Sequence, residues 1–284
     1  MKKPLRNQKI LQGRNKKITG KPLGMNHTST QKKPSQWIFG THAVQAALLN
    51  PKRNCTKLLV TERQLSRLNK FLKQNPTIKS KTLDLQVVEK NVLEQCLPDG
   101  VVHQGITANF SRLPSHNLTN FVKALEQDCP ALLVLIDQGS DPRNVGAIMR
   151  SAAALGAKGI ILPRHNSPDL AGSLAKAASG GLETLPVFQV NNLARTLEDI
   201  KNHGFWVVGL EGSAKEVIET FQWPLRSVLI LGSEGKGLRK LTQNKCDFSI
   251  RIPMCPNIQS LNLSNAAAIA IYDFQAKSSQ HSKT

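Results

Sequence analysis

Several features that mark common protein classes are missing from this 284-residue chain. Its five cysteines include no C-x-x-C pair, which argues against a zinc site and a disulfide framework and suits a reducing compartment. No apolar run reaches membrane-spanning length, and the beginning of the chain lacks the apolar core of a secretory signal. We therefore expect a cytoplasmic protein with no metal and no membrane partner, and keep a mitochondrial location as the alternative.

Two common nucleotide-binding motifs are also missing. No window matches the Walker pattern G-x-x-x-x-G-K-[ST], which disfavours a nucleotide hydrolase. The dinucleotide pattern G-x-G-x-x-G fails because Lys240 stands where the third glycine belongs after Gly235 and Gly237. An ordinary Rossmann-type domain would carry its glycine-rich loop after the first strand, whereas the glycine cluster of this chain comes late.

Acidic residues are scarce. The chain has 38 Lys and Arg against 19 Asp and Glu, and its formal net charge of +19 points to an anionic partner, with nucleic acid first. Residues 1–36 contain ten Lys or Arg and no Asp or Glu, in a polar composition that cannot build a core. We expect this segment to be a disordered leader that grips phosphates without sequence preference, and the alternative is a leader that only aids solubility.

Apolar residues make up 40% of the chain, which is enough for a folded core, and the patterns divide it into two units. Residues 37–112 predict a small α/β unit with an exposed basic side, and 113–129 read as a linker that includes a helix at 118–127. In the first unit we expect a helix that ends before Asn50-Pro51, a strand at 57–60, an amphipathic basic helix at 62–73, a strand at 83–88, a short helix capped by Asn91 and a strand at 101–110.

The second unit, residues 130–284, alternates strands with helices. Short apolar strands are expected at 132–136, 159–162, 206–210, 228–231 and 248–252. Helical patterns lie at 142–156, 169–179, 192–203, 236–244 and 262–276. This alternation predicts βαβ units and a parallel sheet covered on both faces.

A glycine-rich turn follows the strand at 228–231. The strand ends at Gly232, and glycines 232, 235 and 237 surround a single carboxylate, Glu234. A strand, a glycine-rich turn and a helix together present backbone N–H and C=O groups to a ligand at the carboxyl edge of a sheet. Glycine permits positive φ and lets a ligand approach bare backbone, so this turn is a candidate binding site.

Two more turns carry polar groups in similar positions. In the first, Asp141 can cap a helix that Pro142 begins, which leaves Asn144 and Arg150 as polar groups near its start. In the second, an extended proline-containing loop leads to Ser260-Leu-Asn262-Leu-Ser at the start of an alanine-rich helix. Each turn alone is explained by helix capping and a solvated arginine.

Taken together, Asn144…Arg150, Gly232-Ser-Glu234-Gly and Ser260-Leu-Asn262-Leu-Ser resemble motifs 1, 2 and 3 of the SpoU (TrmH-type) branch of the SPOUT RNA methyltransferases. The resemblance covers nearly all of residues 37–275 and includes His103-Gln-Gly-Ile in the first unit, which looks like a substrate-binding domain. Within this branch the chain is most similar to enzymes that methylate a guanosine ribose in 23S rRNA.

The resemblance implies a fold and a set of site residues. The fold would be a parallel-sheet α/β domain with a trefoil knot, preceded by the smaller α/β domain, in a homodimer that uses S-adenosylmethionine as cofactor and large-subunit rRNA as substrate. The cofactor would lie against Leu210, Gly232, Ser233, Ile252, Met254 and Leu261. The catalytic polar set would be Asn144, Arg150, Glu234 and Asn262. Candidate RNA contacts are His103, Arg143, Lys236 and Arg239, although a histidine in the position of His103 is more often a core or edge residue.

Two other functions remain open on the sequence. The same chemistry could act on tRNA, because the three turns do not encode the substrate, although a separate first unit favours rRNA. A non-catalytic RNA-binding protein with degenerate pockets is the second alternative. The presence of all four polar site residues argues against it.

Overall fold

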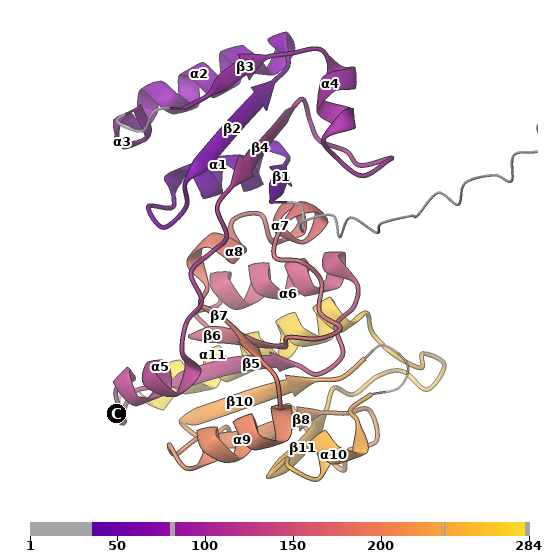
Figure 1. Ribbon diagram of the computed structural model, residues 1–284. Coiled ribbons are helices and arrows are strands. Elements are labelled where there is room, and N and C mark those ends of the chain that lie inside the picture. The colour runs from indigo at the N-terminus through magenta and orange to yellow at the C-terminus, as the bar shows by residue number, and fades with distance from the viewer. Residues whose placement is uncertain (1–35, 80–82, 234, 236, 282–284) are drawn as a thin grey trace, which may run out of the picture. The chain divides into compact units, whose positions relative to one another are not determined.

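The computed structural model describes residues 36–79, 83–233, 235 and 237–281. Residues 1–35 of the basic leader lie outside these ranges, as do the candidate site residues Glu234 and Lys236. Within the described ranges the strands form two separate sheets (Figure 1). No helix in the described part of the chain is both long enough and apolar enough to cross a membrane.

The first sheet has four strands within the described residues, in the order β1-β4-β2-β3. Its strands are β1 Trp37–Phe39, β2 Cys55–Val60, β3 Leu85–Val87 and β4 Ile106–Phe110. The helices between them in the chain are α1 Thr41–Leu49, α2 Glu62–Gln74, α3 Pro76–Lys79 and α4 Lys90–Gln95. The central strand β4 pairs antiparallel with both β1 and β2, whereas β3 pairs parallel with β2. A connecting segment that contains α5 (Leu118–Ala124) leads to the second sheet.

The second sheet has seven strands within the described residues, in the order β7-β6-β5-β10-β8-β11-β9. Its strands are β5 Ala131–Ile136, β6 Gly159–Pro163, β7 Val187–Val190, β8 Trp206–Leu210, β9 Glu216–Val217, β10 Arg226–Leu231 and β11 Phe248–Arg251. Its helices are α6 Pro142–Ala154, α7 Gly172–Ala178, α8 Gly181–Thr184, α9 Leu193–Lys201, α10 Lys240–Gln243 and α11 Leu263–His281. Each pair of neighbouring strands is parallel, as the alternation of strands and helices predicts.

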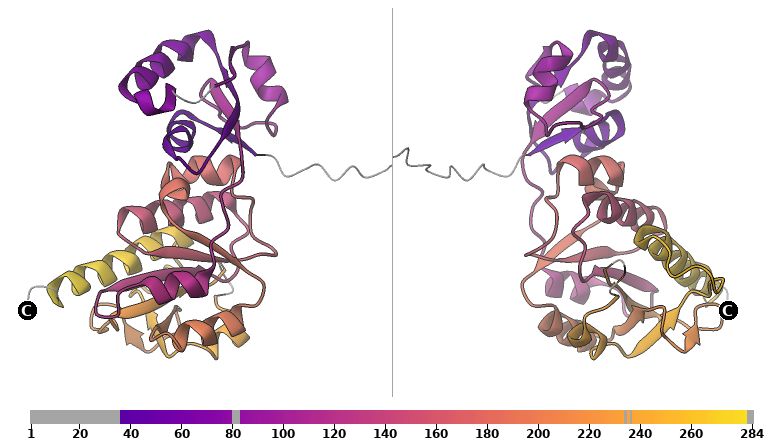
Figure 2. Two further views of the ribbon diagram at one scale, coloured as in Figure 1. Left: turned by 60° about the vertical axis from the view of Figure 1, so that its left-hand side comes forward. Right: turned by 90° about the vertical axis from the view of Figure 1, so that its right-hand side faces the viewer.

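Both faces of the second sheet are covered, which explains why β5 and β10 are buried along their whole length. Alternate residues of β5 point to opposite sides: Leu132 and Val134 join one hydrophobic core, and Leu133 and Leu135 join the other. Helices α6, α7 and α11 cover the first side, and α5 and α9 cover the second (Figure 1). Both views in Figure 2 show α11 running beside α6, with which it is in contact.

Most expected elements are found, and the misplaced boundaries have local causes. The strand expected at 101–110 begins only at Ile106, because Gln104 and Gly105 have positive φ values of 57° and 75°. The helix expected at 236–244 begins only at Lys240, after Gly235 and Gly237 with φ of 80° and 66°. The expectation that Asn91 caps a helix was wrong, since the N-cap of α4 is Glu89.

A buried ion pair joins residues that lie 130 positions apart in the sequence. Arg53 Nε donates a hydrogen bond of 3.0 Å to the Glu183 carboxylate, and Arg53 Nη2 lies 2.9 Å from the other carboxylate oxygen as an ion pair. The two side chains are only 1% and 5% exposed. Asn50 also donates to this carboxylate, at 2.8 Å, and Arg53 donates to the Ser111 carbonyl at 3.0 Å. These contacts tie the turn between α1 and β2 to α8.

Candidate active site

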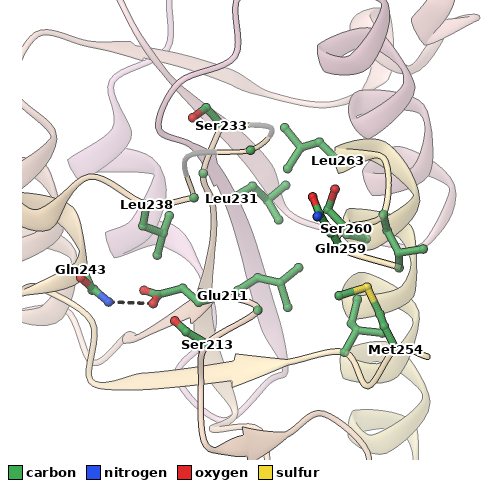
Figure 3. Close-up of a pocket in the computed structure, with 18 residues that line it drawn as sticks. Glu211, Ser213, Leu231, Ser233, Leu238, Gln243, Met254, Gln259, Ser260 and Leu263 are labelled. Carbon is green, nitrogen blue, oxygen red and sulfur yellow. Dashed lines mark hydrogen bonds between the residues drawn. The ribbon is translucent and has the colours of Figure 1, made fainter. Parts of the chain in front are cut away.

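The carboxyl ends of β8, β10 and β11 open onto a hollow of about 450 Å³ (Figure 3). In a parallel sheet these strand ends lie at one edge, which is where ligands bind in open α/β folds. The far wall comes from the loop that leads into α11, so segments from four parts of the chain surround the hollow. All six residues expected to hold the cofactor line it: Leu210, Gly232, Ser233, Ile252, Met254 and Leu261.

The glycine-rich turn forms one wall of the hollow by folding back on itself. Ser233 and Gly237 exchange two backbone hydrogen bonds of 3.0 Å each. A Cβ at Gly232 would lie 2.2 Å from the carbonyl carbon of Gly237, so glycine is needed there for the fold of the turn itself. Gly235 and Gly237 adopt positive φ, and a Cβ on either would meet open space, so their conformation is what requires glycine.

Two polar atoms at the hollow are buried and have no hydrogen-bond partner among the described residues: Ser233 Oγ and Glu211 Oε1. The other oxygen of Glu211 accepts a hydrogen bond of 2.7 Å from Gln243 (Figure 3). Leu231, Leu238 and Met254 supply apolar surface between these polar groups. A ligand that combines an apolar ring with hydroxyl and amino groups, such as the adenosine part of S-adenosylmethionine, fits these polar groups and this volume.

Asp137, at the end of β5, anchors the segment that follows the glycine-rich turn. Its side chain is fully buried and accepts hydrogen bonds from the Arg239 guanidinium, with Nε at 2.9 Å, and from Thr242 Oγ1 at 2.9 Å. The bond to Asp137 raises the pKa of Arg239, so the arginine stays charged. Arg239, expected as an RNA contact, is thus held by a buried carboxylate, although 48% of its side chain remains exposed.

Asn144 and Asn262 meet, although 118 positions separate them in the sequence. The Asn262 side-chain amide donates to Asn144 Oδ1 at 3.1 Å. Its own Oδ1 accepts hydrogen bonds from the Ser264 backbone N–H at 2.9 Å and the Ser264 hydroxyl at 2.6 Å, which is the contact expected of an N-cap for α11. The Asn262 side chain therefore both caps α11 and brings motif 3 into contact with motif 1.

Arg143 and Arg150 line a different hollow of about 650 Å³, together with His42 and Lys176. Both arginines are exposed on α6, and neither makes an ion pair with a described residue. Lys176 donates to the Val102 carbonyl at 2.6 Å and lies 5.9 Å from the centre of the Phe39 ring. Several positively charged side chains line this second hollow, as expected of a binding site for an RNA phosphate.

His103 is only 5% exposed. Its Nδ1 accepts a hydrogen bond of 3.1 Å from the Gly105 backbone N–H, and the ring lines a third hollow beside α2. Glu234 and Lys236 lie outside the described residues, so their expected roles stay predictions. Among the described residues no three His, Cys, Asp or Glu side chains cluster closely enough to hold a metal ion.

Sequence reasoning missed Glu211, Gln243 and Asp137. Glu211 and Asp137 directly follow strands β8 and β5, and Gln243 is the last residue of α10. Nothing in the immediate sequence of these residues marks them. The sequence also gave no sign of the environment of Cys246. Burial, with a smaller contribution from the Glu211 charge, raises the pKa of this thiol to about 12. The thiol therefore stays protonated at neutral pH and is a poor nucleophile.

Comparison with known protein families finds two matches that together span most of the chain. Residues 131–272 match the model described as the SpoU rRNA Methylase family. Residues 37–115 match the model described as RNA 2′-O ribose methyltransferase substrate binding. The two matches coincide with the parts of the chain that form the second and the first sheet.

Several known proteins are similar to this chain, and each match covers most of this chain and most of the other protein. YacO from Bacillus subtilis, provisionally named a TrmH family tRNA/rRNA methyltransferase, is 39% identical over 201 residues, which are 70% of this chain and 80% of YacO. The 23S rRNA (guanosine-2′-O-)-methyltransferase RlmB of Shewanella oneidensis is 38% identical over 242 residues, 83% of this chain and 95% of RlmB. The SpoU methyltransferase AviRb from Streptomyces viridochromogenes, in complex with AdoMet, has the same fold, with a TM-score of 0.70 at 22% identity over 85% of this chain and 89% of AviRb.

Proposed function

The chain belongs to the SpoU rRNA methylase family, and we propose that it transfers a methyl group from S-adenosylmethionine to the ribose 2′-hydroxyl of a guanosine in 23S rRNA. The observation that carries this proposal is the hollow at the carboxyl edge of β8, β10 and β11. The resemblance to the SpoU motifs implies six residues that hold the cofactor, and these six come from separate turns that meet around one cavity. Adenosine is about the right size and polarity for that cavity.

Similarity to RlmB over 83% of this chain and 95% of RlmB supports 23S rRNA as the substrate. RlmB of Shewanella oneidensis acts on 23S rRNA according to its name, and a match of 242 residues is long enough to reach into both sheets of this chain. The name of YacO covers both tRNA and rRNA, so tRNA is the substrate of the alternative function. A cytoplasmic location fits either substrate.

When bound, S-adenosylmethionine would supply a methyl group bonded to a positively charged sulfur: a bond forms from the RNA 2′-oxygen to the methyl carbon, the bond from that carbon to sulfur breaks, and the 2′-hydroxyl loses its proton. The chain's part is to bind both reactants in line and to exclude water. Correct positioning alone can contribute about 7–11 kcal/mol in favourable cases. The apolar side chains Leu231, Ile252 and Met254 would cover the adenine, and Ser233 Oγ and Glu211 Oε1 would gain the hydrogen-bond partners that they lack among the described residues.

The proposed catalytic set is Asn144, Arg150, Glu234 and Asn262. The hydrogen bond between Asn262 and Asn144 supports a shared position for motifs 1 and 3. Arg150 is a poor general base, because a guanidinium stays protonated at neutral pH. Its role in the proposal is to grip the phosphate next to the target ribose and to hydrogen-bond the nucleophilic oxygen. Glu234 would hold Arg150 or one of the asparagines in place.

The role of Arg150 can be tested with an Arg150→Lys variant. Lysine keeps the charge but cannot form the paired, planar hydrogen bonds of a guanidinium. We expect a large loss in the rate of methyl transfer at saturating RNA, with little change in the affinity for S-adenosylmethionine. Near-normal turnover would show that the paired geometry is not needed.

The proposal assigns separate tasks to the parts of the chain. Residues 37–112 would bind the RNA, 113–129 would link the domains, and 130–284 would form the knotted methyltransferase domain. The two family matches, 37–115 and 131–272, support this division. Among the proposed RNA contacts, Arg143 lies in the cation-rich hollow with Arg150, whereas Arg239 could reach RNA only with the exposed part of its side chain.

A homodimer is part of the proposal. Ile269 and Tyr272 lie one turn apart on α11 and are 41% and 64% exposed, so this helix offers apolar surface to a second copy of the chain. Sedimentation analysis of the wild type and of a Tyr272→Glu variant measures the assembly. We expect a dimer whose dissociation constant rises in the variant, and a monomeric wild type would contradict this part of the proposal.

The function itself is tested by incubating the protein with labelled S-adenosylmethionine and, separately, protein-free 23S rRNA, ribosome assembly intermediates and tRNA. Ribose 2′-O-methylation is then mapped nucleotide by nucleotide. We expect label at a guanosine of 23S rRNA. Label in tRNA alone would favour the alternative substrate, and RNA binding without transfer in any sample would identify a non-catalytic RNA-binding protein.

A further inference from the structure

A third hollow, of about 640 Å³, lies within the first α/β unit and shares no lining residue with the cofactor hollow. It is bounded by α2, by α4 and by the segment 101–105, and we call it the α2–α4 hollow. Its volume falls within the range of about 300–1,000 Å³ that is usual for ligand sites. The segment 101–105 contains the His103-Gln-Gly motif, for which the methyl-transfer site gives no explanation.

The charge of the α2–α4 hollow comes mainly from two arginines. Arg63 and Arg67 line it one helical turn apart on α2, are exposed, and make no ion pair with a described residue. Lys90 on the opposite side is already paired with Glu94 at 3.0 Å, so these two charges offset each other. Two adjacent guanidinium groups without a carboxylate partner are well suited to a phosphate, which they can bind with paired hydrogen bonds.

His103 gives the same hollow a hydrogen-bond donor in a fixed orientation. Because its Nδ1 accepts from the Gly105 N–H at 3.1 Å, the proton of the neutral ring is on Nε2. The nearest carboxylate oxygen, Glu94 Oε1, is 3.9 Å from Nε2, which is too far for a hydrogen bond. With only 5% of the residue exposed, the ring cannot turn away from this position without disturbing its surroundings.

The loop that carries His103 is held in an uncommon conformation. Gln104 has a φ of 57°, and its side-chain Oε1 accepts a hydrogen bond of 2.9 Å from the Thr41 backbone N–H. Gly105 accepts from the Thr61 N–H at 2.9 Å, and a Cβ on Gly105 would lie 2.5 Å from Thr61 Oγ1. Backbone strain that several contacts hold in place is found most often at functional sites.

The segment 101–104 also leads to the proposed active site. Val101, Val102 and Gln104 line both the α2–α4 hollow and the hollow that contains Arg143 and Arg150. Val102 is 66% exposed, so it presents apolar surface beside the cationic groups. A single RNA strand could therefore pass from Arg63 and Arg67 across this segment to Arg150.

We propose that the α2–α4 hollow binds one unpaired nucleotide of the RNA substrate, distinct from the nucleotide that is methylated. Its phosphate contacts Arg63 and Arg67, and its base lies against Val101 and Val102 and accepts a hydrogen bond from His103 Nε2. This inference rests on the proposed function, because it takes RNA as the substrate. Proteins recognise RNA sequence mainly through such unpaired bases, which can leave the stack and enter a pocket.

A pair of double variants on one helix tests the phosphate contacts. Arg63→Ala/Arg67→Ala removes two charges that line the hollow, and Lys70→Ala/Lys73→Ala removes two charges from α2 that do not line it. Affinity for protein-free 23S rRNA is measured against salt concentration. We expect the arginine variant to bind at least about tenfold more weakly, with a salt slope smaller by about 0.7 for each phosphate that is no longer neutralised, and the lysine variant to stay within about twofold. Equal losses of affinity in the two variants would overturn the proposal, since they would indicate a diffuse cationic field.

The base contact is tested with His103→Asn. Asparagine can place an oxygen near the position of Nδ1 and keep the bond to Gly105, but its side chain is too short to replace the Nε2 donor. The probes are a short single-stranded oligoribonucleotide and the same ribose-phosphate chain without bases. We expect the wild type to prefer the oligonucleotide with bases and His103→Asn to lose much of that preference, with an unchanged unfolding midpoint. An unchanged preference in a folded variant would remove His103 from the site.

These measurements can fail independently of the proposed function. Binding is recorded without S-adenosylmethionine, so a protein that binds RNA through the α2–α4 hollow but transfers no methyl group contradicts only the proposed function. An enzyme that methylates 23S rRNA while Arg63→Ala/Arg67→Ala behaves like the lysine control contradicts only this inference.

Discussion

At the scale of single residues, Asn262 combines a structural contact with a place in the proposed catalytic set. Its Oδ1 accepts from Ser264 at the start of α11, and its Nδ2 donates to Asn144. These two contacts can be separated by substitution, because serine is also a good N-cap but is too short to bridge to Asn144.

We predict different results for Asn262→Ser and Asn262→Ala. The serine variant should keep nearly wild-type stability, whereas alanine should lower the free energy of unfolding by about 0.5–2 kcal/mol through loss of the cap. Both should transfer methyl groups slowly, because neither can donate to Asn144. Urea unfolding and single-turnover transfer at saturating RNA measure the two effects. Normal transfer by Asn262→Ser would show that Asn262 matters only as a cap.

Some residues of the cofactor hollow could be predicted because they lie in turns with an unusual composition. Gly232 follows a buried strand, and Leu261 lies in a loop that begins with two prolines, so the resemblance to known motifs had clear sequence features to rest on. Asp137 gave no such signal. Its partners Arg239 and Thr242 are 102 and 105 positions away, and only the folded sheet brings them together.

At the scale of elements, the ion pair of Arg53 and Glu183 connects α8 with the turn before β2. Removing one partner of a buried pair leaves an uncompensated charge, which usually costs about 3–5 kcal/mol. Exposed pairs contribute little, typically about 0–1 kcal/mol. Lys90 and Glu94, whose side chains are 74% and 52% exposed, provide a matched exposed pair in the same protein.

We predict that Arg53→Ala lowers the free energy of unfolding by about 3–5 kcal/mol and that Lys90→Ala lowers it by less than about 1 kcal/mol. A double variant, Arg53→Met/Glu183→Leu, should recover most of the stability, because it removes both charges and keeps apolar volume. Denaturant unfolding of the three variants tests this. A small effect of Arg53→Ala would mean that water reaches the Glu183 carboxylate.

The long elements were predictable, whereas several short ones were not. Strand β5 and helix α6 have continuous apolar or periodic patterns, with Asp141 and Pro142 marking the start of the helix as expected. The strands β7 and β9 were missed. They have only four and two residues, and their place in the sheet depends on pairing with β6 and β11. Pairing between distant strands leaves little trace in a local pattern.

At the scale of the whole molecule, the charge distribution suggests how the protein finds RNA. The leader of residues 1–36 carries ten of the 38 Lys and Arg of the chain and no acidic residue. Such a segment adds phosphate contacts that do not depend on sequence, and these contacts weaken as salt rises.

We predict that deletion of residues 1–36 reduces the salt dependence of RNA binding and leaves turnover at saturating RNA largely unchanged. The slope of log affinity against log salt should fall by about 0.7 for each phosphate of single-stranded RNA that the leader neutralises. A control chain with a neutral leader of the same length separates charge from length. If the slope of the deletion variant equals that of the wild type, the leader takes no part in binding.

The claim on which the proposed chemistry depends is that the turns after β8, β10 and β11 and the loop before α11 together bind one S-adenosyl group. The most direct test is a crystal structure of the protein with S-adenosylhomocysteine. We expect the adenine in the hollow bounded by Gly232, Ile252 and Leu261, with the sulfur directed toward Asn144 and Asn262. An S-adenosylhomocysteine molecule bound at any other place, with this hollow empty, would contradict the claim.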